Sequence, residues 1–142
     1  MLDKHTISLL IEKALQARQA SYSPYSKYQV GAALLVADGK IYTGCNIENA
    51  AYSPTNCAER TAFFKAVSES EMNFEAIAIV GGPKDMEITQ YAFPCGVCRQ
   101  VMMEFCNPES FQIIVAKSVE EYEVKTLKQL LPEGFGAANL QI

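Results

Sequence analysis

The chain has 142 residues, 49% of them hydrophobic and 20% charged, so it is a globular protein long enough to bury a core without disulfide staples. Its formal net charge of −4 argues against nucleic acid as the main partner, because phosphate backbones select basic surfaces. No apolar stretch approaches the roughly 18 residues of a membrane span, and no secretory signal is expected at the N-terminus. We therefore expect one domain, residues 1–142, with neither a nucleic-acid nor a membrane partner.

In chain order, the apolar spacing from Asp3 to about Gln19 predicts a helix with Asp3 as its N-cap. An apolar run then predicts a strand over Val30–Ala37, followed by an Asp38-Gly39 turn and an antiparallel strand over Ile41–Cys45. After a polar loop over 46–56, the predicted elements are a helix from Cys57 to about Ser68, a strand over Ala76–Val80 ended by Gly81-Gly82-Pro83, a helix from about Cys95 to Cys106, strands over Phe111–Ala116 and Glu121–Lys125, and a short helix around Thr126–Leu130. This order predicts an α/β fold, a three-layer α/β/α sandwich around a mixed five-stranded sheet.

Three cysteines in two short strings indicate a metal site: Cys57 in Cys57-Ala58-Glu59, and Cys95 and Cys98 in Pro94-Cys95-Gly96-Val97-Cys98. Both strings fall at predicted helix N-termini, where the helix dipole and free N–H groups stabilise thiolates. Three thiolates hold zinc and leave its fourth tetrahedral position open to water. Glu59 is the candidate that moves the protons of that water.

Three thiolates also over-neutralise a divalent cation, which weakens its effect on the acidity of water. Arg60 is the candidate that draws charge off the sulfurs by donating to them, and Arg99 is a weaker candidate for the same role.

Other interpretations of these cysteines stay open at this point. Cys-x-x-Cys is also the pattern of a redox pair, and a closed structural zinc site would take Cys45 or Cys106 as its fourth ligand, although we expect both to be buried thiols. Asn56-x-x-Glu59 also fits a capping box, which would give Glu59 a structural role. The single histidine, His5, excludes sites with two or three histidine ligands from one chain, and the odd cysteine number indicates a reducing cytoplasm.

The chain resembles the short-chain cytidine deaminases over nearly its whole length, and the motifs that carry the resemblance are Gly44-Cys45-Asn46-Ile47-Glu48-Asn49-Ala50, Cys57-Ala58-Glu59-Arg60 and Pro94-Cys95-Gly96-Val97-Cys98-Arg99-Gln100. The resemblance implies one zinc ion per chain on the three cysteines and a water activated there that attacks C4 of cytosine. It implies that Glu59 takes the proton of that water, passes it to ring N3 and then protonates the departing amino group, which gives uridine and ammonia in pyrimidine salvage.

The resemblance further implies a nucleoside site in which Asn46 and Glu48 bind the ribose hydroxyls and the backbone of Ala58 contacts the base. Tyr28 stands where the family often has a phenylalanine near the base, so its hydroxyl adds a group that needs a partner. The family members are homotetramers, which implies that Tyr52 and Phe135 reach into the pocket of a neighbouring subunit.

The resemblance leaves rival functions that share the zinc motifs. A deaminase of nucleoside-like antibiotics is disfavoured by the Asn46-x-Glu48 pair, which suits a ribose, and a nucleic-acid editing deaminase is disfavoured by the negative charge. A non-catalytic, zinc-stabilised interaction module is the alternative from another functional class.

Overall fold

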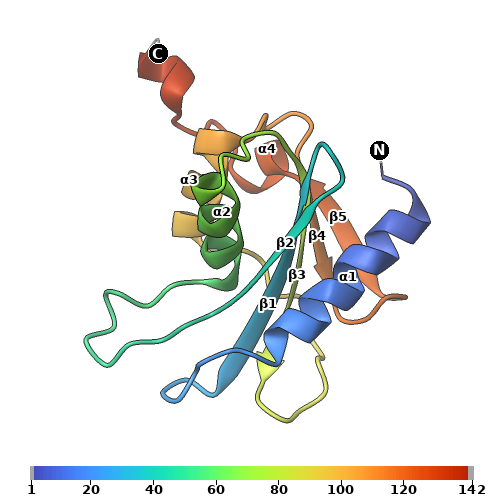
Figure 1. The fold of residues 1–142 in the computed structure, drawn as a ribbon, viewed down its shortest axis with the longest axis vertical. Coiled ribbons are helices and arrows are strands. Elements are labelled where there is room, and N and C mark those ends of the chain that lie inside the picture. Colours follow the sequence, from blue (N-terminus) through green and yellow to red (C-terminus); the bar gives the residue numbers. More distant parts are fainter. Residues whose placement is uncertain (1, 141–142) are drawn as a thin grey trace.

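The computed structural model describes residues 2–140 and has a five-stranded mixed sheet between layers of helices (Figure 1). The strand order is β2-β1-β3-β4-β5. Only β3 and β4 are parallel, and every other neighbouring pair is antiparallel. The strands are β1 (Tyr28–Val36), β2 (Ile41–Cys45), β3 (Phe74–Pro83), β4 (Gln112–Ala116) and β5 (Tyr122–Thr126).

Helix α1 (Lys4–Arg18) covers one face of this sheet, and α2 (Ala58–Ser68), α3 (Gly96–Phe105) and α4 (Leu127–Leu130) lie on the other. A 3₁₀ helix, η1 (Ala137–Leu140), follows. Successive residues of β1 enter the two cores in turn: Ala32 and Leu34 pack toward α2, whereas Ala33 and Leu35 pack toward α1. Both faces of the sheet are thus covered, which explains the continuous apolar run and confirms the predicted three-layer α/β/α sandwich.

The local signals in the sequence act as predicted at several element ends. Asp3 caps α1 by accepting a hydrogen bond from the Thr6 amide at 2.7 Å. Gly39 closes the β1–β2 turn with a φ of 99°, a conformation that glycine adopts at little cost. Thr126 caps α4 through a capping box with Gln129.

The prediction for β3 was wrong at its end, because the strand continues through Gly81-Gly82-Pro83 instead of stopping there. Gly81 and Gly82 pair with Val30 and Gln29 of β1, so they belong to the sheet and not to a turn. A side chain at Gly81 would lie 2.9 Å from the Cβ of Ala92, so glycine is needed for close packing at this position.

Arg18 at the end of α1 holds this end of the sheet together. Its buried guanidinium donates to the carbonyl oxygens of Gln29 at 3.0 Å, Gly82 at 3.0 Å and Pro83 at 2.9 Å. Nothing in the sequence pattern pointed to a buried arginine, because long charged side chains are seldom buried without such partners.

No helix between residues 2 and 140 has the length and hydropathy that a membrane crossing requires.

Candidate active site and metal centre

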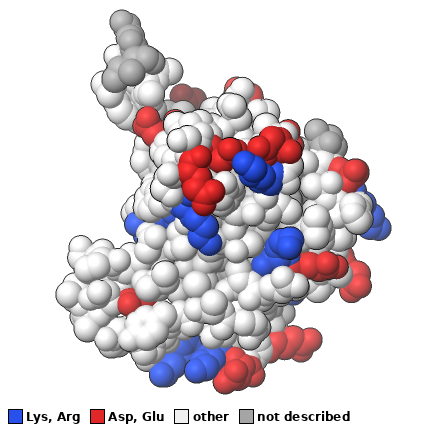
Figure 2. All heavy atoms as spheres, in the orientation of Figure 1, with Lys and Arg blue, Asp and Glu red and all other residues white. Residues whose placement is uncertain are grey.

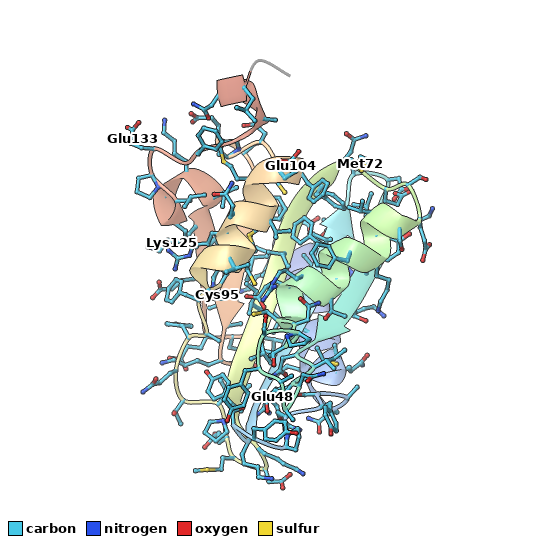
Figure 3. The ribbon with its side chains drawn as sticks, turned by 90° about the vertical axis from the view of Figure 1, so that its left-hand side faces the viewer. Glu48, Met72, Cys95, Glu104, Lys125 and Glu133 are labelled. Atoms are coloured by element: carbon cyan, nitrogen blue, oxygen red, sulfur yellow. The ribbon has the colours of Figure 1, made fainter. Side chains whose placement is uncertain are left out.

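The three predicted cysteine ligands meet at one point, where the first turns of α2 and α3 converge. The Sγ atoms of Cys57 and Cys95 lie 3.7 Å apart, and those of Cys95 and Cys98 lie 3.5 Å apart. All three sulfurs lie within 4.8 Å of one another, and none is in a disulfide. Figure 3 shows Cys95 at the start of α3 on the side that faces α2.

Each helix places its first ligand at its N-cap. Cys57 is the N-cap of α2, and Cys95 is the N-cap of α3, where its sulfur accepts from the Cys98 amide at 3.5 Å. The two helix N-termini therefore direct their free N–H groups and positive dipole ends toward the sulfur cluster.

The start of α2 is fixed against β2 by close backbone packing and by one threonine. A side chain at Gly44 would come within 2.5 Å of the Ala58 carbonyl oxygen, so only glycine lets the helix approach the strand this closely. The Thr61 hydroxyl lies 3.0 Å from the Cys45 carbonyl oxygen and 3.2 Å from that of Cys57, and it can donate to either. The helix start that carries Cys57 is therefore held against β2 by this backbone packing and by the Thr61 hydroxyl.

The sulfur geometry fits zinc. Zinc–sulfur bonds of about 2.3 Å in a tetrahedron put neighbouring sulfurs about 3.8 Å apart, close to the two separations observed here. Among residues 2–140, the cluster consists of these three cysteines, with neither Cys45 nor Cys106 as a fourth ligand. Burial raises the pKa of both of those thiols. They are partly buried, whereas we expected buried thiols from the sequence.

The cysteines of the cluster differ in how easily they lose a proton before metal binds. Hydrogen bonding to the Cys98 thiol, followed by the guanidinium of Arg60, lowers the pKa of Cys57 to about 5 against the opposing effect of burial. The same bond to Cys57, together with burial, raises the pKa of Cys98. Of these two cysteines, Cys57 is therefore the one that loses its proton first, and metal binding releases the proton of Cys98.

Glu59 lies beside the sulfurs with only 4% of its surface exposed. Burial raises the pKa of its carboxyl to about 7, with a smaller contribution from the negative charge on Cys57. The capping-box interpretation is wrong, because Cys57 is the N-cap and the Asn56 amide donates to the Ile47 carbonyl oxygen at 2.9 Å. A buried carboxyl group without a capping role is the kind of group that transfers protons in active sites.

Arg60 donates from Nη2 to the Sγ of Cys57 at 3.3 Å, and its Nε is buried without a hydrogen-bond partner. A buried N–H group beside a sulfur cluster is suited to a second sulfur contact. The alternative candidate, Arg99, does not reach the sulfurs. Its guanidinium donates to the carbonyl oxygens of Pro94 at 2.8 Å and Leu130 at 2.7 Å, which ties α3 to α4.

A cavity of about 400 Å³ opens onto this centre, and its walls include three predicted substrate residues, Tyr28, Asn46 and Ala58. The side chain of Asn46 is held on β1: Oδ1 accepts from the Val30 amide at 2.9 Å, and Nδ2 donates to the Tyr28 carbonyl oxygen at 2.8 Å. One N–H of the amide group is left for a ligand.

Glu48 and Tyr52 line a second cavity of about 390 Å³, which shares Thr55 with the first. The carboxylate of Glu48 accepts from the amides of Tyr25 at 3.0 Å and Ser26 at 3.1 Å and from the Ser26 hydroxyl. The Ser26 hydroxyl is the largest cause that lowers the pKa of Glu48, so this side chain is a fixed carboxylate. Figure 3 shows Glu48 below Cys95, toward the lower end of the molecule in that view.

Phe135 lies outside both cavities of its own chain, and it is 58% exposed. Sequence reasoning missed other residues that line the first cavity, above all Tyr91, Ala92 and Phe93. Two aromatic residues in an otherwise polar loop, directly before Pro94-Cys95, were the signal that could have found them.

Comparison with known proteins gives the same picture over most of the chain. The family model described as the cytidine and deoxycytidylate deaminase zinc-binding region matches residues 4–114. A cytidine deaminase of Sporosarcina psychrophila is 49% identical, with 94% of each chain covered. A cytidine deaminase of Halalkalibacterium halodurans is 46% identical, with 93% of this chain and 96% of that protein covered.

Solved structures agree with these sequence matches. The crystal structure of a cytidine deaminase from Burkholderia pseudomallei has a TM-score of 0.82 and 42% identity, and the match covers 94% of this chain and 100% of that chain. That of a cytidine deaminase from Mycobacterium tuberculosis has a TM-score of 0.77 and 36% identity, with 96% and 99% covered.

Proposed function

Because the chain belongs to the cytidine and deoxycytidylate deaminase family, we propose that it hydrolyses cytidine and deoxycytidine to uridine and deoxyuridine with release of ammonia. It is a zinc-dependent enzyme with one zinc ion per chain. The observation that carries this function is the meeting of three sulfurs and one buried carboxyl group beside a cavity large enough for a nucleoside, whose lining includes Cys57, Cys95 and Glu59.

Cys57, Cys95 and Cys98 would hold the zinc ion, which when bound supplies the Lewis acidity that makes water nucleophilic at neutral pH. Glu59 holds and moves protons: its carboxylate accepts one proton from the attacking water and delivers it to ring N3. It then takes the proton of the new hydroxyl group on C4 and passes it to the amino group as the C4–N bond breaks, which leaves a carbonyl group and ammonia. The burial that raises the pKa of Glu59 also keeps bulk water from competing for these protons. A pKa of about 7 leaves Glu59 partly in its carboxylate form at neutral pH, so Glu59 begins the reaction as a base.

Arg60 acts on the sulfurs and not on the substrate. Its hydrogen bond to Cys57 draws negative charge from the thiolate, which leaves more of the cation's field for the water.

The ribose contacts follow from the two polar side chains on the loop after β2. Asn46 has one free N–H donor, and the carboxylate of Glu48 has remaining acceptor capacity, so together they match hydroxyl groups that both accept and donate. Tyr28 and the backbone of Ala58 lie on the cavity wall, where they would contact the base.

An absorbance assay with cytidine, deoxycytidine and CMP, each with and without a chelator, tests this function. We expect turnover of both nucleosides, none of CMP, and loss of activity with the chelator. A chain without turnover of either nucleoside would contradict the proposal, and turnover of CMP would contradict a free-nucleoside site.

A homotetramer with shared active sites is also part of the proposal. The segment over 46–56 projects from the body of the molecule, and Glu48 is its only charged residue (Figure 2). Tyr52 is 72% exposed at the tip of this segment and has a φ of 44°, a left-handed conformation that is costly for a tyrosine. An exposed aromatic ring held at such a cost is suited to contact with a partner subunit. Phe135 is suited to the same role, because it is exposed and lies outside both cavities of its own chain.

Mixed oligomers test the sharing of sites. Glu59→Gln and Phe135→Ala chains are each expected to be weakly active, whereas their co-expression restores activity at sites that combine an intact Glu59 with an intact Phe135 from a neighbour. Light scattering gives the subunit number. No recovery in hybrids, or a monomeric active enzyme, would contradict shared sites.

We also place the enzyme in the cytoplasm and in pyrimidine salvage, with residues 1–142 as one catalytic domain. Free thiols that must stay reduced to bind metal support a reducing compartment.

A further inference from the structure

A cation–π contact lies next to the substrate cavity and has no role in the chemistry described above. The Nζ of Lys117 lies 4.7 Å from the centroid of the Tyr91 ring. Tyr91 lines the cavity, whereas Lys117 does not. The contact thus joins the cavity wall to a residue outside it.

The contact connects two segments at the same end of the sheet. Tyr91 lies in the loop between β3 and α3, and Lys117 directly follows β4, which is parallel to β3. Figure 1 shows this loop in yellow and the β4–β5 turn in orange at the same end of the strands. Ligands bind at the carboxyl ends of parallel strands in folds of this type. Here the carboxyl ends of β3 and β4 lead into the two segments that the contact joins.

Lys117 is itself held in place by Glu121, which lies in the same turn between β4 and β5. Its Nζ lies 3.3 Å from a carboxylate oxygen of Glu121, and its backbone amide donates to the Glu121 carbonyl oxygen at 2.9 Å. Tyr91 in turn meets Phe93 edge to face, with ring centroids 6.4 Å apart, and both rings line the cavity. A chain of contacts therefore runs from Glu121 through Lys117 and Tyr91 to Phe93.

We propose that Tyr91 and Phe93 form an aromatic wall for the planar ring of the substrate, and that Lys117 is a positioning residue that fixes this wall through the ring of Tyr91. The loop needs such a support because 84–95 contains no helix or strand of its own. The rings present flat and edge surfaces that suit a nucleobase. This inference rests on the proposed function, because it names the nucleoside base as the group that the wall receives.

Lys117→Met tests the inference, because it removes the charge but keeps an apolar stem of similar length. We measure uridine binding to the zinc-loaded enzyme by calorimetry, together with kcat and KM for cytidine. Since a cation–π contact near the surface is worth about two- to five-fold in an equilibrium constant, we expect weaker uridine binding and a higher KM within that range. The kcat value should stay near wild type, because Lys117 does not touch the reacting atoms. Lys117→Arg should restore binding.

Three further variants separate this role from a general effect of charge or stability. Lys128→Met removes a lysine of another exposed ion pair, with Glu109 at 2.9 Å, and should bind uridine like the wild type. Glu121→Gln removes the ion pair but keeps the cation over the ring, so it should have a smaller effect than Lys117→Met. In a Tyr91→Leu background, Lys117→Met should cause no additional loss.

Unchanged uridine binding in Lys117→Met, or an equal loss in the Tyr91→Leu background, would overturn the inference while wild-type turnover still supports the deaminase. A wild-type chain that neither turns over cytidine nor binds uridine would overturn both.

Discussion

The guanidinium of Arg60 donates to the sulfur of Cys57 at 3.3 Å, one residue after the buried carboxyl group of Glu59. One turn of α2 thus supplies a metal ligand, a proton carrier and a positive charge that acts on the ligand. Cys57, Glu59 and Arg60 are neighbours in the sequence because the first turn of one helix carries all three side chains to the same N-terminus.

Replacement of Arg60 by alanine should move the acidic limb of the pH–rate profile to higher pH. Without the guanidinium, more negative charge stays on the sulfurs, so the water that attacks the substrate loses its proton less readily. A kcat profile for the variant from pH 4.5 to 9, with the zinc content measured in parallel, checks this. An unchanged profile at full zinc content would mean that Arg60 has no electrostatic role.

Glu59→Gln keeps the shape of the side chain but removes its ability to carry protons. We expect zinc binding to persist and kcat to fall by about 10²- to 10⁴-fold, the usual contribution of positioned proton transfer. Metal analysis and steady-state kinetics on the same preparation give both values. Near-normal turnover would show that another group carries the protons.

Gly44→Ala should weaken both the fold and the metal centre. The added methyl group would lie 2.5 Å from the Ala58 carbonyl oxygen and push the start of α2, with Cys57, away from the sheet. We expect a loss of about 1–3 kcal/mol in the free energy of unfolding, together with weaker zinc retention in competition with a chelator.

Gly96→Ala is the matched control, because a side chain at Gly96 meets no atom within 4 Å although it also lies at a helix start beside a zinc ligand. Equal zinc loss in both variants would contradict the packing explanation.

Tyr42 should make the protein sensitive to alkaline pH. Burial, followed by the hydrogen bond to Glu69 at 2.9 Å, raises the pKa of Tyr42 from 10.0 to about 12. The folded protein thus holds this proton more tightly than the unfolded chain, so the stabilisation is fully present below pH 10 and is lost as pH rises through 12.

Denaturant unfolding of wild type and Tyr42→Phe between pH 9 and 12 measures this difference. The difference in stability between the two proteins should shrink as pH rises, and a constant difference would contradict the shifted pKa.

The sequence predicted most of the fold and the centre of the site because both depend on local signals. Apolar runs and caps placed the helices and strands, and the spacing within Cys95-Gly96-Val97-Cys98 placed two sulfurs on one helix turn. The sequence-based predictions were wrong where packing between segments distant in the sequence determines the structure. Gly81-Gly82 looked like a strand end, but the strand continues through both residues, and Ala92 packs so closely that a side chain at Gly81 would lie 2.9 Å from its Cβ.

The cavity wall shows the same limit. Tyr91 and Phe93 lie in a loop without periodicity, so the sequence offered only their position before Pro94-Cys95 as a signal, and nothing in it indicated that Lys117 contacts Tyr91. Arg99 is closer to a cysteine in sequence than Arg60 is, yet only Arg60 reaches a sulfur, because the side chain of Arg99 is bound by the carbonyl oxygens of Pro94 and Leu130.

The most direct test of the account is the zinc content of the purified protein, measured together with cytidine turnover before and after chelation. We predict one zinc ion per chain, loss of uridine formation when the metal is removed, and its return when zinc is restored. A metal-free protein that still converts cytidine to uridine would contradict the central claim that Cys57, Cys95 and Cys98 form a catalytic zinc centre.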